Sequence, residues 1–169
     1  HFLKSKVRAS QKAKLTTKSS LKGLDKDRVT IPTNPDDLQD QLQQLLRATL
    51  GSKVELVNCE IGNQHHDYLV LLANLHHPTT EVVIKLAGPE APIFCPFDRT
   101  AALHQLVREN TTILMPEVLA VDVSCQQWPW RYFIKRYVPG QEWATVHSQL
   151  NSFELIEAYA QIGNVVAQL

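Results

Sequence analysis

One lysine inside an apolar, strand-like run is the residue with the clearest capacity for chemistry. The run is Glu81-Val82-Val83-Ile84-Lys85-Leu86. Side chains of a strand alternate between its two faces, so Val83 and Lys85 are expected on one face and the other apolar residues on the opposite face. A lysine on the inner face of a sheet is costly unless an anion meets it, and phosphate is the anion most often bound this way. Taken alone, the tetrapeptide that ends at Lys85 favours a lysine that extends from the strand end into solvent, and the segments that follow it in the sequence favour the anion site.

The elements expected around this strand follow the order helix, three strands, helix, two strands, helix. Short polar loops separate the first three strands, which is typical of antiparallel hairpins. The pattern predicts an α+β fold with a five-stranded antiparallel sheet, a helix inserted after the third strand, and flanking helices. The expected strands cover residues 54–61, 68–75, 81–86, 118–123 and 131–138, and the expected helices cover 34–50, 98–109 and 151–169.

Composition places few constraints on function but excludes some classes. The chain has 169 residues, of which 44% are hydrophobic, enough for a buried core. No apolar run approaches the ~20 residues of a membrane span, so a membrane protein is not expected. The cysteines at 59, 95 and 125 have neither a disulfide-framework nor a zinc-site spacing, which suits a cytoplasmic location.

The N-terminal segment differs in charge from the rest of the chain. Residues 1–30 hold nine Lys or Arg against two Asp, a net charge of +7. A basic segment can bind nucleic acid or an acidic membrane surface. This one has no sustained apolar period, so a solvated, disordered extension is the expected state and nucleic acid is not an expected partner. The predicted organisation is an extension over 1–33, a lobe over 34–138, and a linker with a leading helix over 139–169.

Two His-His pairs, at 65–66 and 76–77, raise the question of a metal site. They lie at opposite ends of one expected strand of eight residues. At about 3.3 Å per residue the pairs are more than ~20 Å apart and cannot share one ion. Each pair is expected to be exposed loop histidine, and no metal ligand is assigned.

The order of elements and several segments resemble the ATP-binding N-terminal lobe of the aminoglycoside phosphotransferase family, which has a kinase-like fold. The resemblance covers residues of about 52–169. Val82-Val83-Ile84-Lys85 is similar to the family's third strand and to the Val-Ala-Ile-Lys of protein kinases. The other segments are Phe97-Asp98-Arg99 before the inserted helix, residues 115–122, residues 132–140, which are similar to the linker between lobes, and residues 162–169.

The resemblance implies a site for ATP on one face of the sheet. Lys85 would bind its phosphates, and Val83, on the same face, would line the slot for the base. Backbone N–H and C=O groups of the linker would read adenine where the last strand ends. The implied contacts with the nucleotide come from Lys85, Val83, Gly62, Asn63, Arg136, Tyr137 and Val138, although the loop at Gly62 is not a Gly-x-Gly-x-x-Gly.

Two departures limit what this chain does alone. The family has Arg-Glu at the start of the inserted helix, where the glutamate pairs with the strand lysine, whereas this chain has Arg99-Thr100. The family's His-Gly-Asp loop and its Mg²⁺ ligands belong to a C-terminal lobe, and no His-Gly-Asp occurs here. No catalytic residue is therefore assigned within the chain. The expectation is a lobe of a kinase-type transferase that acts on a small hydroxyl compound and is not catalytic alone.

Two other functions stay open. The missing glutamate also fits a degenerate kinase-like module that binds nucleotide, or a partner, without turnover. An unrelated α+β interaction domain could share the order of strands. The helix from Asn151 is apolar around most of its circumference, which predicts burial against the protein's own C-terminal lobe or a partner chain.

Overall fold

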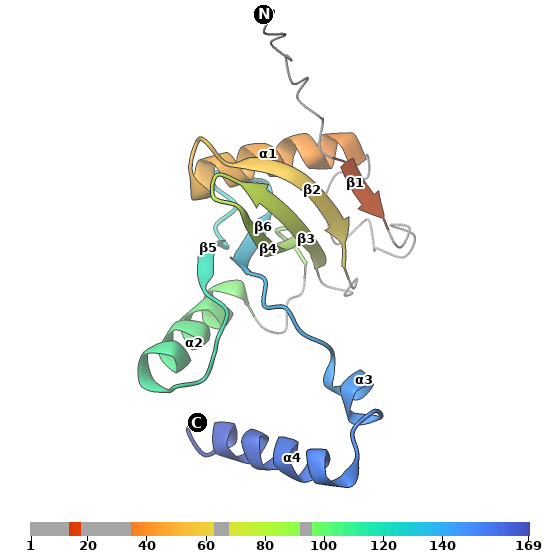
Figure 1. Ribbon diagram of the computed structural model, residues 1–169. Helices are drawn as coiled ribbons and strands as arrows, with labels where there is room; N and C mark the ends of the chain where they lie inside the picture. Colours follow the sequence, from red (N-terminus) through yellow and green to blue (C-terminus); the bar gives the residue numbers. More distant parts are fainter. Residues whose placement is uncertain (1–13, 18–34, 63–67, 92–95) are drawn as a thin grey trace, which may run out of the picture.

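The computed structural model describes residues 14–17, 35–62, 68–91 and 96–169, and its centre is a single sheet (Figure 1). The strands lie in the order β1-β2-β3-β4-β6-β5. Every neighbouring pair from β2 onward is antiparallel, which confirms the predicted α+β fold and five-stranded antiparallel sheet. The strands are β1 (Lys14–Thr17), β2 (Glu55–Ile61), β3 (Leu69–His76), β4 (Thr80–Ala87), β5 (Val118–Asp122) and β6 (Arg131–Arg136), and the helices are α1 (Pro35–Leu50), α2 (Phe97–Asn110), α3 (Trp143–His147) and α4 (Ser152–Val166).

Helix α1 covers one face of the sheet and forms the main core with it (Figure 1). Its leucines recur at helical spacing, and the four on the inner stripe are completely buried. The sheet contributes the alternate residues of β2, β3, β4 and β6, because a strand buries every second side chain. The stripe consists of Leu38, Leu42, Leu45 and Leu46.

Strand β1 was not predicted, because the sequence of residues 1–33 indicates a disordered extension. Residues 14–17 pair in parallel with β2, with Lys14 opposite Asn58 and Thr17 opposite Ile61. The remainder of that segment lies outside the described residues. A four-residue edge strand leaves little trace in the sequence, since its partner lies some 40 positions away.

Helix α2 contacts β5 and β6, on the opposite face of the sheet from α1. A second, smaller core anchors it there. Phe97 of α2 and Phe133 of β6 are both buried, and their ring centroids are 6.1 Å apart. Buried His104 meets the same ring edge-on at 5.7 Å. Helix α2 is therefore held over the sheet by aromatic contacts.

Helices α3 and α4 lie apart from the sheet, beyond the linker that follows β6 (Figure 1). Asn151 caps α4, and Glu154 completes a capping box with it, as the sequence predicts. Trp143 of α3 packs edge-on against Tyr159 of α4, with centroids 5.7 Å apart. The apolar side chains of α4 are mostly exposed: Phe153, Ile156, Tyr159, Ile162, Val165 and Val166.

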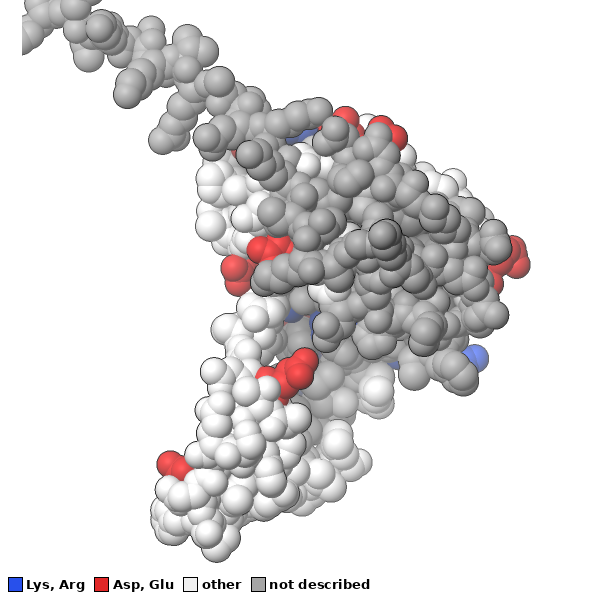
Figure 2. Space-filling model, turned by 90° about the vertical axis from the view of Figure 1, so that its right-hand side faces the viewer, with Lys and Arg blue, Asp and Glu red and all other residues white. Residues whose placement is uncertain are grey.

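The surface over α3 and α4 has a distinct character. From residue 137 to the last residue the chain has no Lys or Arg, whereas Glu142, Glu154 and Glu157 are present. Figure 2 accordingly shows wide uncharged areas, interrupted by acidic side chains, in the lowest part of the molecule. None of the helices that the structure describes is long and apolar enough to cross a membrane.

Candidate functional site

Lys85 lies on the face of the sheet opposite α1, in the interior strand β4. The side chains before and after it, Ile84 and Leu86, are fully buried in the main core, whereas Lys85 is half-buried. Its register partners are Val70 of β3 and Phe133 of β6. The predicted alternation is thus correct, and Lys85 emerges from the middle of a sheet face, with a strand on each side.

An aromatic ring contacts the ammonium of Lys85, and two further rings continue from it toward α2. Its Nζ lies 4.8 Å from the centre of the Tyr68 ring, a cation–π contact. Tyr68 in turn meets Phe97 edge-on at 5.9 Å between centroids, and Phe97 packs on Phe133. We call these three rings, Tyr68, Phe97 and Phe133, the aromatic shelf. The shelf thus runs from the ammonium of Lys85 to α2, which contributes Phe97.

A second lysine lies beside the first. Lys135 of β6 is the register partner of Val83, so it occupies the diagonal position relative to Lys85 on the same face. Burial lowers the pKa of Lys135, since an ammonium loses solvation in the sheet surface. Two neighbouring cations on one sheet face favour an anionic ligand.

His104 of α2 approaches this pair of lysines from above the sheet. Its Nδ1 lies 3.4 Å from the carbonyl oxygen of Pro116. A carbonyl only accepts, so Nδ1 carries the proton and Nε2 of the neutral ring is an acceptor. The pKa of His104 is lowered, mainly by burial and further by the charges of Lys135 and Lys85, while the Pro116 contact opposes this. Near neutral pH the ring therefore adds no third positive charge.

Thr100 stands where the resemblance implies a glutamate, and its hydroxyl is used at the start of α2. Its hydroxyl donates to the carbonyl oxygen of Pro96, at 3.0 Å. Asp98, the alternative acid weighed from the sequence, is exposed. His104 lies one helical turn after Thr100, and the charge of Lys85 is among the causes that lower its pKa. It was not predicted from the sequence, although the spacing of four residues from Thr100 indicates the same helix face.

The linker offers fewer free backbone groups than predicted. The N–H of Arg136 donates to the carbonyl of Glu117, and the N–H of Tyr137 donates to the carbonyl of Glu81, each at 2.9 Å. The expectation of unpaired N–H groups at these two residues is therefore wrong, because the ladder continues past the end of β6. Base recognition would fall to their carbonyl groups and to Val138, which is 55% exposed.

The linker and Lys85 lie at a separation that suits an extended ligand. Tyr137 pairs with Glu81, four residues before Lys85 on the same strand. At about 3.3 Å per residue the two points are ~13 Å apart along β4. Val83 lies between them on the same face and is half-buried. A nucleotide stretched from base to phosphates can span this length over Val83.

The remaining predicted residues belong to the loop after β2. The N–H of Gly62 donates to the carbonyl of Val70 at 2.9 Å, so this group is used in the sheet and not for a phosphate. A Cβ on Gly62 would meet Val70 at 3.5 Å, an ordinary contact, so the backbone does not require glycine here. Asn63 lies outside the described residues.

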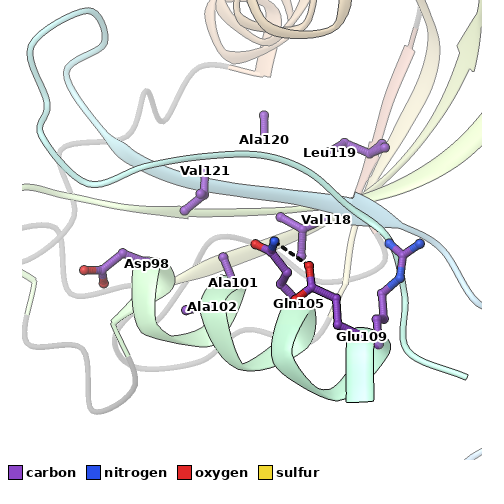
Figure 3. Close-up of a pocket in the computed structure, with 10 residues that line it drawn as sticks. Asp98, Ala101, Ala102, Gln105, Glu109, Val118, Leu119, Ala120 and Val121 are labelled. Carbon is purple, nitrogen blue, oxygen red and sulfur yellow. Dashed lines mark hydrogen bonds between the residues drawn. The ribbon is translucent and has the colours of Figure 1, made fainter. Parts of the chain in front are cut away.

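A separate hollow of about 750 Å³ lies between α2 and β5 (Figure 3). None of the predicted site residues that the structure describes lines it. Gln105 donates to Glu109 across one turn of the helix at its rim, at 2.8 Å. Its apolar wall comes from Val118 and Val121 of β5 and from Ala101 of α2.

Comparison of the chain with models of protein families, with curated proteins and with solved structures gives no match in any of the three.

Proposed function

We propose that this chain is the ATP-binding lobe of a small-molecule phosphotransferase of the aminoglycoside phosphotransferase type. The observation that carries the proposal is the placement of Lys85. It emerges from the interior of the sheet face opposite α1, with its ammonium over the Tyr68 ring and diagonal to Lys135. Two cations held in half-buried positions are suited to the phosphates of a nucleotide.

The residues of this lobe would bind and orient ATP. Lys85 and Lys135 neutralise phosphate charge, Val83 contacts the base or ribose, and the carbonyl groups of Arg136 and Tyr137 accept from the amino group of adenine. Phosphoryl transfer additionally needs a carboxylate that positions the acceptor hydroxyl, and ligands for Mg²⁺. We assign these to a second lobe, together with the binding of a small hydroxyl-bearing substrate. The lobe described here binds ATP and does not turn it over alone.

The exposed face of α4 supports the presence of such a second lobe. Phe153 is 67% exposed and Ile156 is 69% exposed. Side chains of this size each contribute roughly 1.5–3 kcal/mol when buried, so a helix with this composition gains from being covered. We propose that the protein's own C-terminal lobe covers it, and that a partner chain is the alternative. The free thiols of Cys59 and Cys125 suit a cytoplasmic site of action.

A second candidate function is a kinase-like module that binds nucleotide without turnover. The observation that favours it is Thr100, which stands where the resemblance implies a glutamate and whose hydroxyl donates to the carbonyl oxygen of Pro96. Without a glutamate at this position, the lobe would bind phosphate but would position it less firmly for transfer.

The two candidates are separated by steady-state phosphotransfer and ATP binding in the protein that carries both lobes. In the transferase, Lys85→Ala lowers turnover by orders of magnitude and leaves the circular dichroism spectrum unchanged. An unchanged rate in Lys85→Ala would show that the lysine is structural. Saturable ATP binding with no turnover, in the presence of a range of hydroxyl compounds, would instead identify the binding module.

A further inference from the structure

Three exposed side chains meet at the end of the sheet where the β3–β4 hairpin turns. Glu55, the first residue of β2, is the register partner of His76, the last residue of β3. Residues directly opposite in an antiparallel pair share a face, with Cβ atoms about 4.5–5.5 Å apart. The carboxylate of Glu55 is thus placed beside the ring of His76.

The conformation of the turn after β3 brings the ring of His77 beside the ring of His76 and the carboxylate of Glu55. Consecutive side chains of a strand point to opposite faces, so His77 would leave the cluster if β3 continued. Instead His77 has φ 58°, in the left-handed region, and the chain turns. As a result the rings of His76 and His77 lie edge-on with centroids 5.7 Å apart. One nitrogen of each ring and one oxygen of Glu55 all lie within 4.8 Å of one another.

We propose that Glu55, His76 and His77 form a binding site for a zinc ion, with water completing its coordination. Two imidazoles and a carboxylate are typical zinc ligands, at bond lengths of about 2.0–2.2 Å. In a tetrahedral site with such bonds the ligand atoms are about 3.4 Å apart. The three side chains are exposed, so small rotations about their own bonds close the remaining separation.

The chemistry of the ligands selects the kind of ion. Imidazole favours Zn²⁺, Ni²⁺ and Cu²⁺, whereas Mg²⁺ prefers sets of oxygen ligands. This site is therefore distinct from any Mg²⁺ that accompanies ATP. From the sequence, one ion shared by the two His-His pairs was excluded, and neither pair was expected to bind metal. The third ligand was missed because Glu55 precedes His76 by 21 positions, and only the strand register unites them.

Zinc binding is measured by isothermal titration calorimetry on the whole chain, with His76→Asn, His77→Asn and Glu55→Gln as test variants. Asparagine removes the imidazole, and at position 77 it tolerates the left-handed conformation. The matched control is His65→Asn with His66→Asn, which removes two imidazoles of the other pair. Thermal unfolding with and without Zn²⁺ gives a second readout, since an ion that binds only the folded state raises Tm.

The expected result is one Zn²⁺ per chain, with binding at least about tenfold weaker in each histidine variant, a difference of ~1.4 kcal/mol. Binding in the control is unchanged, and Mg²⁺ gives no heat at this site. The proposal is overturned if the chain shows no saturable zinc binding. It is equally overturned if the His65/His66 control loses the binding while the His76 and His77 variants retain it.

Discussion

Phe133 is the residue whose truncation should reveal most about how α2 is attached to the sheet. It is 1% exposed, contacts Phe97 and His104 of α2, and is the register partner of Lys85. Phe133→Ala leaves a cavity where the aromatic shelf meets the helix. Truncation of a buried phenylalanine costs about 3–5 kcal/mol. In a chain of this size 1 kcal/mol shifts Tm by roughly 2–4 °C, so a fall of about 6–20 °C is expected.

The same chemical change at an exposed position supplies the control. Phe153 of α4 is 67% exposed, so Phe153→Ala should change the free energy of unfolding by no more than about 0.5 kcal/mol. Phe133→Leu keeps most of the volume and should cost less than about 1.5 kcal/mol. The assay is urea unfolding followed by tryptophan fluorescence, with Tm from calorimetry. Equal effects of the alanine substitutions at 133 and 153 would refute the assignment of Phe133 to a core that anchors α2.

Three further predictions concern the site and its surroundings. Thr100→Glu should tighten ATP binding about twofold to fivefold, because a partly exposed ion pair with Lys85 contributes about 0.5–1 kcal/mol. An unchanged Kd for ATP in a titration would show that the acid does not reach the lysine. Because the pKa of His104 is lowered in the folded state, the unfolded chain binds more protons than the folded chain. The free energy of unfolding should therefore fall as pH drops below about 6.5, the ordinary pKa of histidine. His104→Gln should flatten this slope in unfolding measurements between pH 5 and 8. Burial raises the pKa of the Cys59 thiol to about 12. After alkylation at pH 8, peptide mapping should therefore find Cys125 labelled and Cys59 protected until the chain is unfolded. Rapid labelling of Cys59 in the native chain would contradict its burial.

Much of the fold could be predicted because it depends on local patterns. The leucine stripe of α1 and the capping box at Asn151 are periodicities and spacings within a few residues. The alternation around Lys85 follows from strand geometry alone. Each of these features is encoded in one short segment, and the structure confirms it.

The features that could not be predicted depend on contacts between distant segments. Strand β1 exists only through pairing with β2, and the linker N–H groups at Arg136 and Tyr137 are occupied only because β5 and β4 lie beside them. His104 faces the lysines only once α2 has docked on Phe133. Cross-strand register likewise brings Glu55 to the histidine pair. In each case the residue type was visible, but its neighbour depended on register or docking.

The geometry around Lys85 was predicted in part. Lys85 and Val83 share the open face, as the alternation indicates, and the linker begins beside the same strand. Lys135 was missed because a lysine near the end of a strand is usually a solvated residue. Only its pairing with Val83 shows that it lies diagonal to Lys85.

The most direct test of the nucleotide-binding claim is a titration of the ¹⁵N-labelled chain with Mg·ATP, followed by amide chemical shifts. Lys85→Met removes the charge on the open face, and Lys53→Met, at an exposed position before β2, removes the same charge elsewhere. We expect saturable shifts at Val83, Lys135 and Val138 in the native chain and in Lys53→Met. In Lys85→Met we expect at least about tenfold weaker binding, ~1.4 kcal/mol. No saturable shifts in the native chain, or equal affinity in the two methionine variants, would show that Lys85 does not bind the nucleotide.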